Sequence, residues 1–214
     1  MLRQSLICTR LRVLLSGCLL LLSSAVLAQV SPLDARMKKV LSDHAASSAS
    51  VTAAKKVTFF CDVCHGVNGS SVKADVPNLA GQNSSYLLTQ IDKFSRGQRQ
   101  EKFMEGLMKL LTEEDRINVA IFYSGKTIEP AGKEGSLTGQ ALYTARCAVC
   151  HAEHAHGNET TPRLAGQQIE YLKKSIKRYR DRTGERIYEP MSASTYSLKE
   201  NEIQALAVYL SSLK

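Results

Sequence analysis

Two short stretches of the chain place two cysteines and a histidine at a spacing that suits covalent attachment of a haem. Residues 61–65 read Cys-Asp-Val-Cys-His, and residues 147–151 read Cys-Ala-Val-Cys-His. Cysteines three positions apart project to one side of a helix, where their thiols can add across the vinyl groups of a porphyrin. The adjacent imidazole then reaches the iron from the same helical turn. The sequence therefore predicts two haem c groups per chain. The attachment residues are Cys61, Cys64, Cys147 and Cys150, and the iron ligands are His65 and His151.

Other sites that use cysteine pairs explain these motifs less well. A disulfide or a thioredoxin-like pair leaves the histidine that follows both motifs without a role, and the strand pattern of a thioredoxin fold is missing. A four-cysteine zinc site would require the two motifs to share one metal, although each motif is complete in itself. Haem attachment accounts for every residue of both motifs.

A haem that only passes electrons needs a sixth iron ligand, and a methionine is available in each half. Met191 is the only methionine of the second half and lies 40 residues after His151. Met104 lies 39 residues after His65 and, like Met191, is followed by a leucine seven positions later. A thioether ligand raises the reduction potential and keeps the iron six-coordinate. We expect Met104 and Met191 to be these ligands, with Met108 as the rival to Met104.

The remaining polar candidates lie in the loops that follow the two motifs. Pro77 and Pro162 are expected to shape loops in which a carbonyl accepts the free ring N–H of the histidine ligand. The alternative interpretation is that both prolines only form turns in these loops. His154 and His156 are typical of exposed loop residues, and either one is the alternative to Met191 as an iron ligand.

The two motifs belong to a longer internal repeat. The second motif follows the first at an offset of 86 residues. The segment Pro-x-Leu-Ala-Gly-Gln at residues 77–82 returns at residues 162–167, and the pattern of Met104 with its following leucine returns at Met191. Because the matched positions keep their order, the chain is predicted to contain two tandem modules. Modules of this size usually need a buried group such as a haem to complete the core.

Apolar spacing predicts helices in both modules and no strand of useful length. Tyr86, Leu87, Ile91 and Phe94 share one helical face, and residues 171–179 repeat that spacing. Each cysteine motif is expected to end a short amphipathic helix. Residues 112–115 and 197–200 both fit a capping box at the start of a final helix. Behind the second box, residues 203–210 carry an apolar stripe at helical spacing.

The first 28 residues have the features of a secretory signal. Three arginines precede an apolar run at residues 13–22, and residues 25–28 place small side chains at the spacing of a cleavage site. Residues 15–18 also resemble a lipoprotein cleavage box ending at Cys18, which makes a lipid-anchored form the alternative. The predicted organisation is a signal peptide at 1–28, a loosely held leader at 29–44, a first module at 45–126, a linker at 127–135 and a second module at 136–214.

The charge of the chain argues against a nucleic-acid partner. The formal net charge is +8, and basic residues are mixed with acidic ones along the chain. Removal of the predicted signal takes away three arginines and no acid, and haem propionates would bring the charge close to neutral. No later apolar run approaches the length that a bilayer requires, so a soluble or peripherally membrane-associated periplasmic protein is expected.

These motifs together resemble the dihaem cytochrome c4 family, within the class I cytochrome c fold. The resemblance covers nearly all of the predicted mature chain. It implies an all-α fold of two tandem class I cytochrome c-like domains, each around one covalently bound haem with histidine and methionine ligands. Two positions depart from the family pattern: Ala152 replaces the glycine that follows the first motif as Gly66, and Leu198 is not followed by the usual hydroxyl residue.

The expected function is electron transfer without catalysis. The resemblance implies single-electron exchange between periplasmic redox partners, with a terminal oxidase as one such acceptor. The chain would then control ligands, burial and orientation and would have no substrate pocket. One alternative is the cytochrome subunit of a periplasmic dehydrogenase. Another is a peroxidase-like haem enzyme, which would require one open iron position.

Overall fold

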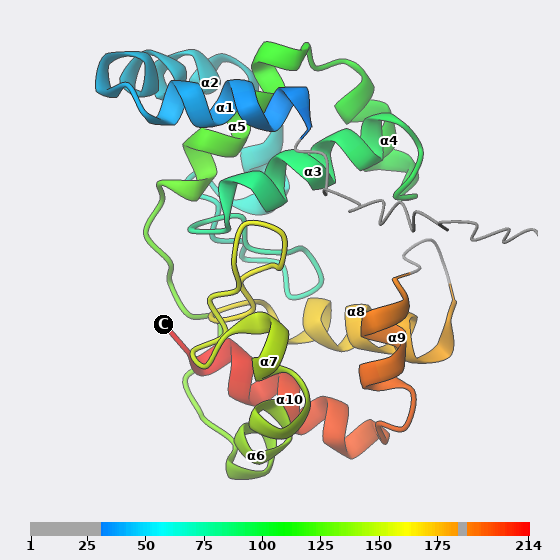
Figure 1. The fold of residues 1–214 in the computed structure, drawn as a ribbon. Coiled ribbons are helices and arrows are strands. Elements are labelled where there is room, and N and C mark those ends of the chain that lie inside the picture. The colour runs from blue at the N-terminus through cyan, green and yellow to red at the C-terminus, as the bar shows by residue number, and fades with distance from the viewer. Residues whose placement is uncertain (1–30, 184–187) are drawn as a thin grey trace, which may run out of the picture.

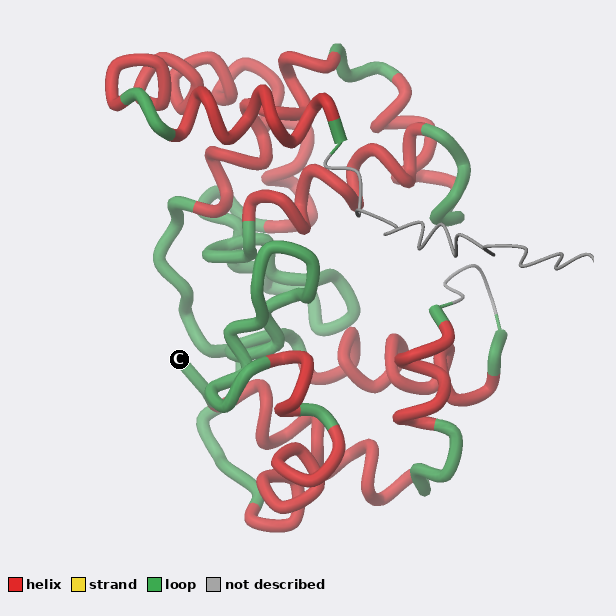
Figure 2. Tube along the Cα trace, viewed as in Figure 1, coloured by secondary structure: helices red, strands yellow, loops and turns green. Residues whose placement is uncertain are grey.

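The computed structural model describes residues 31–183 and 188–214, and these residues form helices and no strand (Figures 1 and 2). The first group of helices is α1 (Pro32–Leu41), α2 (His44–His65), α3 (Ser84–Ser95), α4 (Lys102–Lys109) and α5 (Glu113–Ser124). The second group is α6 (Leu137–Arg146), α7 (Ala148–His151), α8 (Ile169–Asp181), α9 (Glu189–Thr195) and α10 (Glu200–Ser212). The predicted all-α fold is confirmed.

Each group of helices has its own hydrophobic core. In the first core α5 packs against α2 and α3, and in the second α10 packs against α6 and α8. The repeat is visible in the elements themselves, because α8, α9 and α10 follow α3, α4 and α5 at offsets of 85 to 87 residues. The loops that follow the two cysteine motifs lie between the groups, where they face each other (Figure 1). Two tandem domains are therefore present, while the residue bounds given above for each module stay a prediction.

The apolar faces predicted for the repeated helices are buried. In α3, Leu87, Ile91 and Phe94 belong to the first core, whereas Tyr86, predicted on the same face, is half-buried and lies outside it. In α10, the predicted stripe is almost completely shielded from solvent and forms the centre of the second core; it comprises Ile203, Leu206, Ala207 and Leu210. Helical periodicity was sufficient to identify these faces because each helix packs on one side only.

Residues 32–41 differ from the loosely held leader that we expected. They form α1, in which Met37 has no exposed surface and Leu33 is also buried. Both side chains belong to the first core, where α1 contacts α2 and α5. The Ser31 hydroxyl accepts a hydrogen bond from the Leu33 N–H and so caps the start of this helix. The expectation is wrong for this segment because α1 has only ten residues and two buried apolar side chains, which is a weak periodic signal.

The two cysteine motifs end helices, as predicted, but in different ways. The first motif is the last turn of α2, which is 22 residues long and therefore not short. In the second module the helix ends at Arg146, and residues 148–151 form the separate turn α7. After the motifs, Gly66 has φ 80° and Ala152 has φ 65°. In both modules the backbone therefore leaves the histidine with a positive φ, which an alanine adopts at a cost.

The two final helices begin differently. At α5 the Asp115 N–H donates to the Thr112 hydroxyl at 3.1 Å and the Thr112 N–H donates to the Asp115 carboxylate at 3.2 Å, so this capping box is confirmed. The second predicted box, at residues 197–200, is wrong. The cap of α10 is Lys199, whose N–H donates to the Glu202 carboxylate at 2.8 Å. The helix starts two residues later than predicted because Lys199 occupies the position equivalent to Thr112.

None of the helices within residues 31–183 and 188–214 is long and apolar enough to cross a membrane. The predicted signal peptide at 1–28, and with it the alternative at Cys18, lies outside the described residues.

Candidate haem sites

The histidine of each motif is buried at the end of its helix and hydrogen-bonded through one ring nitrogen. His65 Nδ1 donates to the carbonyl oxygen of Pro77 at 2.8 Å, and His151 Nδ1 donates to that of Pro162 at 3.0 Å. The predicted contact between each histidine and a loop carbonyl is confirmed in both modules. A turn-forming role alone does not describe these prolines, since the carbonyl oxygen of each accepts a hydrogen bond from an imidazole.

The electrostatics of both imidazoles suit a metal ligand. Burial lowers the pKa of His65 and of His151, which outweighs the opposite effect of the carbonyl hydrogen bond. Each ring is therefore neutral near pH 7, with its proton held on Nδ1. The lone pair is then on Nε2, and a neutral imidazole with its other nitrogen bonded to a carbonyl is the form that ligates iron. The residues present thus fit a haem.

All four motif cysteines are free thiols in the structure. Cys61 is buried and Cys147 is half-buried, and burial raises the pKa of each thiol to about 11. Cys64 is half-buried and Cys150 is exposed. The disulfide alternative has no support here. The shared zinc site has none either, because no cluster of three or more potential metal ligands occurs among His, Cys, Asp and Glu of the described residues.

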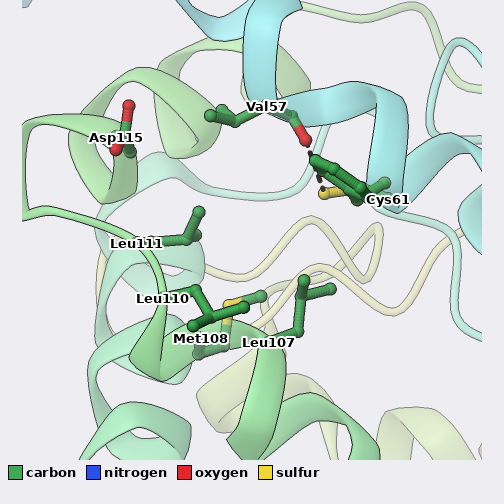
Figure 3. A pocket seen from close by; sticks show the side chains of 8 residues that line it. Val57, Cys61, Leu107, Met108, Leu110, Leu111 and Asp115 are labelled. Carbon is green, nitrogen blue, oxygen red and sulfur yellow. Dashed lines mark hydrogen bonds between the residues drawn. The ribbon is translucent and has the colours of Figure 1, made fainter.

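An apolar cavity of about 180 Å³ lies beside Cys61 in the first module (Figure 3). Its walls come from α2 and from the segment that runs from α4 to the start of α5. The lining residues are Val57, Phe60, Cys61, Leu107, Met108, Leu110, Leu111 and Asp115. A largely hydrophobic wall next to an attachment cysteine fits one face of a porphyrin.

The structure places the two rival methionines of the first module one helical turn apart on α4. Met108 is buried and lines the cavity across from Cys61 (Figure 3), whereas Met104 is half-buried and packs at the edge of the core. Burial alone would favour Met108. The choice between the two methionines stays a prediction.

The second module offers a comparison for these positions. Because α9 follows α4 at an offset of 87, Met191 is equivalent to Met104, and Thr195 is equivalent to Met108. Thr195 is buried as Met108 is, and its hydroxyl donates to the Met191 carbonyl at 2.7 Å. A buried residue without sulfur at this position indicates a packing role for it in both modules. Met191 itself is half-buried, as Met104 is.

The other histidines behave as loop residues. His154 and His156 are both exposed, with ring centroids 6.0 Å apart, and Nε2 of His156 donates to the Lys214 carbonyl at 2.9 Å. Neither belongs to the buried surroundings of His151.

Residues that connect the two modules were not assigned a role from the sequence. Gln82 and Gln167 end the repeated Pro-x-Leu-Ala-Gly-Gln segments, and both are buried. Each makes hydrogen bonds to the backbone of the other module. Their recurrence at equivalent positions was the available signal, but it does not reveal what an amide side chain binds.

The sequence is similar to that of known c-type cytochromes. The sequence profile of the cytochrome c family matches residues 51–122 and again 136–214. Cytochrome c4 of Pseudomonas aeruginosa is 29% identical over 184 residues, which cover 79% of this chain and 90% of that protein. The thiosulfate dehydrogenase electron acceptor of Thiomonas intermedia is 31% identical over 181 residues, or 76% of this chain and 82% of that protein.

The fold is likewise similar to that of a solved cytochrome c4 structure. The crystal structure of reduced recombinant cytochrome c4 from Pseudomonas stutzeri superposes with a TM-score of 0.70 at 26% sequence identity. The match covers 77% of this chain and 98% of that one. The resemblance noted from the motifs therefore extends to the arrangement of both domains.

Proposed function

Because the chain belongs to the cytochrome c family and carries two such domains in tandem, as cytochrome c4 does, we propose that it shuttles electrons between redox proteins of the periplasm. It is an electron-transfer protein with two covalently bound haem c groups. The periplasmic location is supported by the signal-like segment at residues 1–28. Respiratory proteins, with a terminal oxidase among the acceptors, are the proposed partners.

The observation that carries this proposal is the duplicated contact between a buried histidine and a proline carbonyl. In both modules it holds the ring proton on Nδ1, which would leave the Nε2 lone pair available to ligate a metal. We assign the thioether links and the histidine ligands on this basis, and the methionine ligands on their equivalent positions in the repeat. The first haem takes Cys61, Cys64, His65 and Met104, and the second takes Cys147, Cys150, His151 and Met191.

The chain's residues would act by holding and closing the sites. Haem iron supplies the one-electron couple, and two cysteines prevent loss of the group. One histidine and one methionine would both ligate each iron, which would let the iron change charge without exchanging ligands. This closure distinguishes a carrier from a peroxidase-like enzyme, which would need one open position.

A second candidate function is that of electron acceptor for one dehydrogenase. The similarity to a protein named thiosulfate dehydrogenase electron acceptor favours it. Both functions use the same haems and differ only in the partner. Co-purification with a catalytic subunit from the native host would favour the second function, and a free chain that is reduced by several donors would favour the first.

The decisive experiment measures haem stoichiometry and location. The full chain is expressed in a bacterium that matures c-type cytochromes, and we expect two covalent haems per chain in the periplasmic fraction. Replacing both cysteines of one motif by serine should leave one haem, whichever motif is changed. The reduced protein should not bind carbon monoxide near pH 7. Fewer than two haems in the unmodified chain, or ready binding of carbon monoxide, would overturn the proposal.

A further inference from the structure

Two buried glutamines cross the interface between the modules and make the same pair of hydrogen bonds in opposite directions. Gln167, in the second module, accepts from the Asn78 N–H at 2.7 Å and donates to the Asn78 carbonyl at 3.0 Å. Gln82, in the first module, accepts from the Arg163 N–H at 2.8 Å and donates to the Arg163 carbonyl at 2.9 Å. Each amide is thus matched to one backbone residue of the other module.

These backbone residues directly follow the prolines that bind the two histidines. In the peptide group that joins Pro77 to Asn78, the carbonyl oxygen accepts a hydrogen bond from His65 Nδ1. The N–H of the same peptide group donates a hydrogen bond to Gln167 Oε1. The second module repeats this chain of groups through His151, Pro162, Arg163 and Gln82. One peptide group therefore separates each histidine from a side chain of the other module.

Hydrogen bonds at the two ends of one peptide group strengthen each other. A bond from the N–H to a glutamine oxygen increases the negative charge on the carbonyl oxygen, which then accepts more strongly from the imidazole. A stronger bond at Nδ1 makes the histidine a more basic ligand and favours ferric iron. The glutamine thereby influences a metal site that it does not touch.

We propose that Gln82 and Gln167 are positioning residues, and that each lowers the reduction potential of the haem held by the other module. The inference rests on the proposed function, because it requires His65 and His151 to be iron ligands. It adds to that function a residue-specific link between the modules: removal of a side chain in one module should change the haem of the other.

Neighbouring residues supply matched controls. Gln168 crosses the same interface, donating to the Ser71 carbonyl at 2.6 Å and to the Asn78 side chain at 3.1 Å. Asn83 crosses it in the other direction, donating to the Asn158 carbonyl at 2.7 Å. Neither accepts from the N–H of the peptide groups that bind the histidines. Their replacement loosens the interface and leaves the proposed link intact.

The test is a stepwise reduction of the holoprotein, in which the ferric haem-methyl NMR signals report how far each haem has been reduced. The signals are assigned to modules through their contacts with assigned protein protons. Gln167→Leu should shift the one-electron equilibrium constant of the first haem about two- to fivefold toward the ferrous form, with the second haem unchanged. Gln82→Leu should give the mirror result. Gln167→Glu retains an oxygen acceptor for the Asn78 N–H and should not shift the first haem toward the ferrous form.

Faster exchange of the Asn78 amide proton in Gln167→Leu verifies that the hydrogen bond has been removed. Equal shifts of both haems, a shift confined to the haem of the mutated module, or no shift at all would overturn the inference. So would an equally large effect of Gln168→Leu or Asn83→Ala, since general loosening would then explain it. The proposed function is judged separately, by two closed haems in the unmodified protein. If the unmodified protein has two closed haems but the variants show no cross-module shift, the proposed function stands and only this inference fails.

Discussion

The Nδ1 nitrogen of His65 lies 2.8 Å from the carbonyl oxygen of Pro77, although the two residues are twelve positions apart. Burial keeps the imidazole neutral, and this one contact decides which ring nitrogen holds the proton. His151 and Pro162 repeat the arrangement at 3.0 Å. The same tautomer is thereby selected in both modules by backbone groups.

The first prediction concerns the ring protons of these two histidines. In the ferrous, diamagnetic holoprotein, the Nδ1 protons of His65 and His151 should exchange slowly with solvent because each is buried and bonded to a carbonyl. Nitrogen-15 labelling of histidine and exchange into deuterated water will measure this. The exposed His154 supplies the internal control and should exchange within the dead time. Equally fast exchange at all three rings would contradict the hydrogen-bonded arrangement.

The second prediction separates the rival methionines by substitutions that remove sulfur and conserve volume. Met191→Leu should remove part of the ferric thioether-to-iron charge-transfer band and open the second iron to carbon monoxide. Met104→Leu should do the same for the first iron. Met108→Leu should keep the full band, because its equivalent in the second module is Thr195. Loss of the band in Met108→Leu but not in Met104→Leu would reverse the assignment.

The third prediction tests the contribution of α1 to the first core. Met37→Ala should lower the free energy of unfolding by about 2–5 kcal/mol, because this side chain has no exposed surface and leaves a cavity when truncated. Thermal or denaturant unfolding of the holoprotein will measure the loss. Lys39→Ala, on the exposed side of the same helix, should change stability by less than about 0.5 kcal/mol. Similar values for the two variants would mean that α1 does not contribute to the core.

The fourth prediction concerns the backbone after the second motif. Ala152 has φ 65°, where an alanine is disfavoured relative to glycine. Ala152→Gly should therefore raise the free energy of unfolding of the second module by about 0.5–1 kcal/mol, as judged by chemical denaturation.

Gly66→Ala is the opposite experiment in the first module. A Cβ atom there would lie 2.2 Å from the Ser70 carbonyl oxygen, so this variant should be destabilised. A loss of stability in Ala152→Gly would show that the strain assigned to this position is not significant.

The fifth prediction concerns the start of α10, where a lysine occupies the cap position. Lys199→Thr should stabilise the protein by about 0.5–1 kcal/mol, since a hydroxyl can accept from the free N–H groups of the first turn. Thr112→Ala removes the equivalent hydroxyl from α5 and should cost about 1 kcal/mol. Denaturant titrations of both variants provide the measurement. No gain in Lys199→Thr would mean that the introduced hydroxyl does not accept from the first-turn N–H groups.

The sequence by itself determined the features that depend on residues a few positions apart. The two Cys-x-x-Cys-His motifs, the buried faces of α3 and α10, and the capping box at Thr112 were all predicted, because helical geometry relates residues three or four positions apart. The number of modules followed from the ordered repeat. The same local rules misplaced the start of α10, where Lys199 interrupts the pattern. They also missed α1, in which only Leu33 and Met37 are fully buried.

Only the tertiary structure decided which groups from distant parts of the chain meet. The burial of Met37 and the pairing of Gln82 with Arg163 and of Gln167 with Asn78 join positions separated by many residues. Every residue except proline carries the same backbone N–H, and every residue carries the same carbonyl, so a side-chain pattern cannot say which of them an amide will bind. That choice is made when the two cores form and bring the loops of the two modules together.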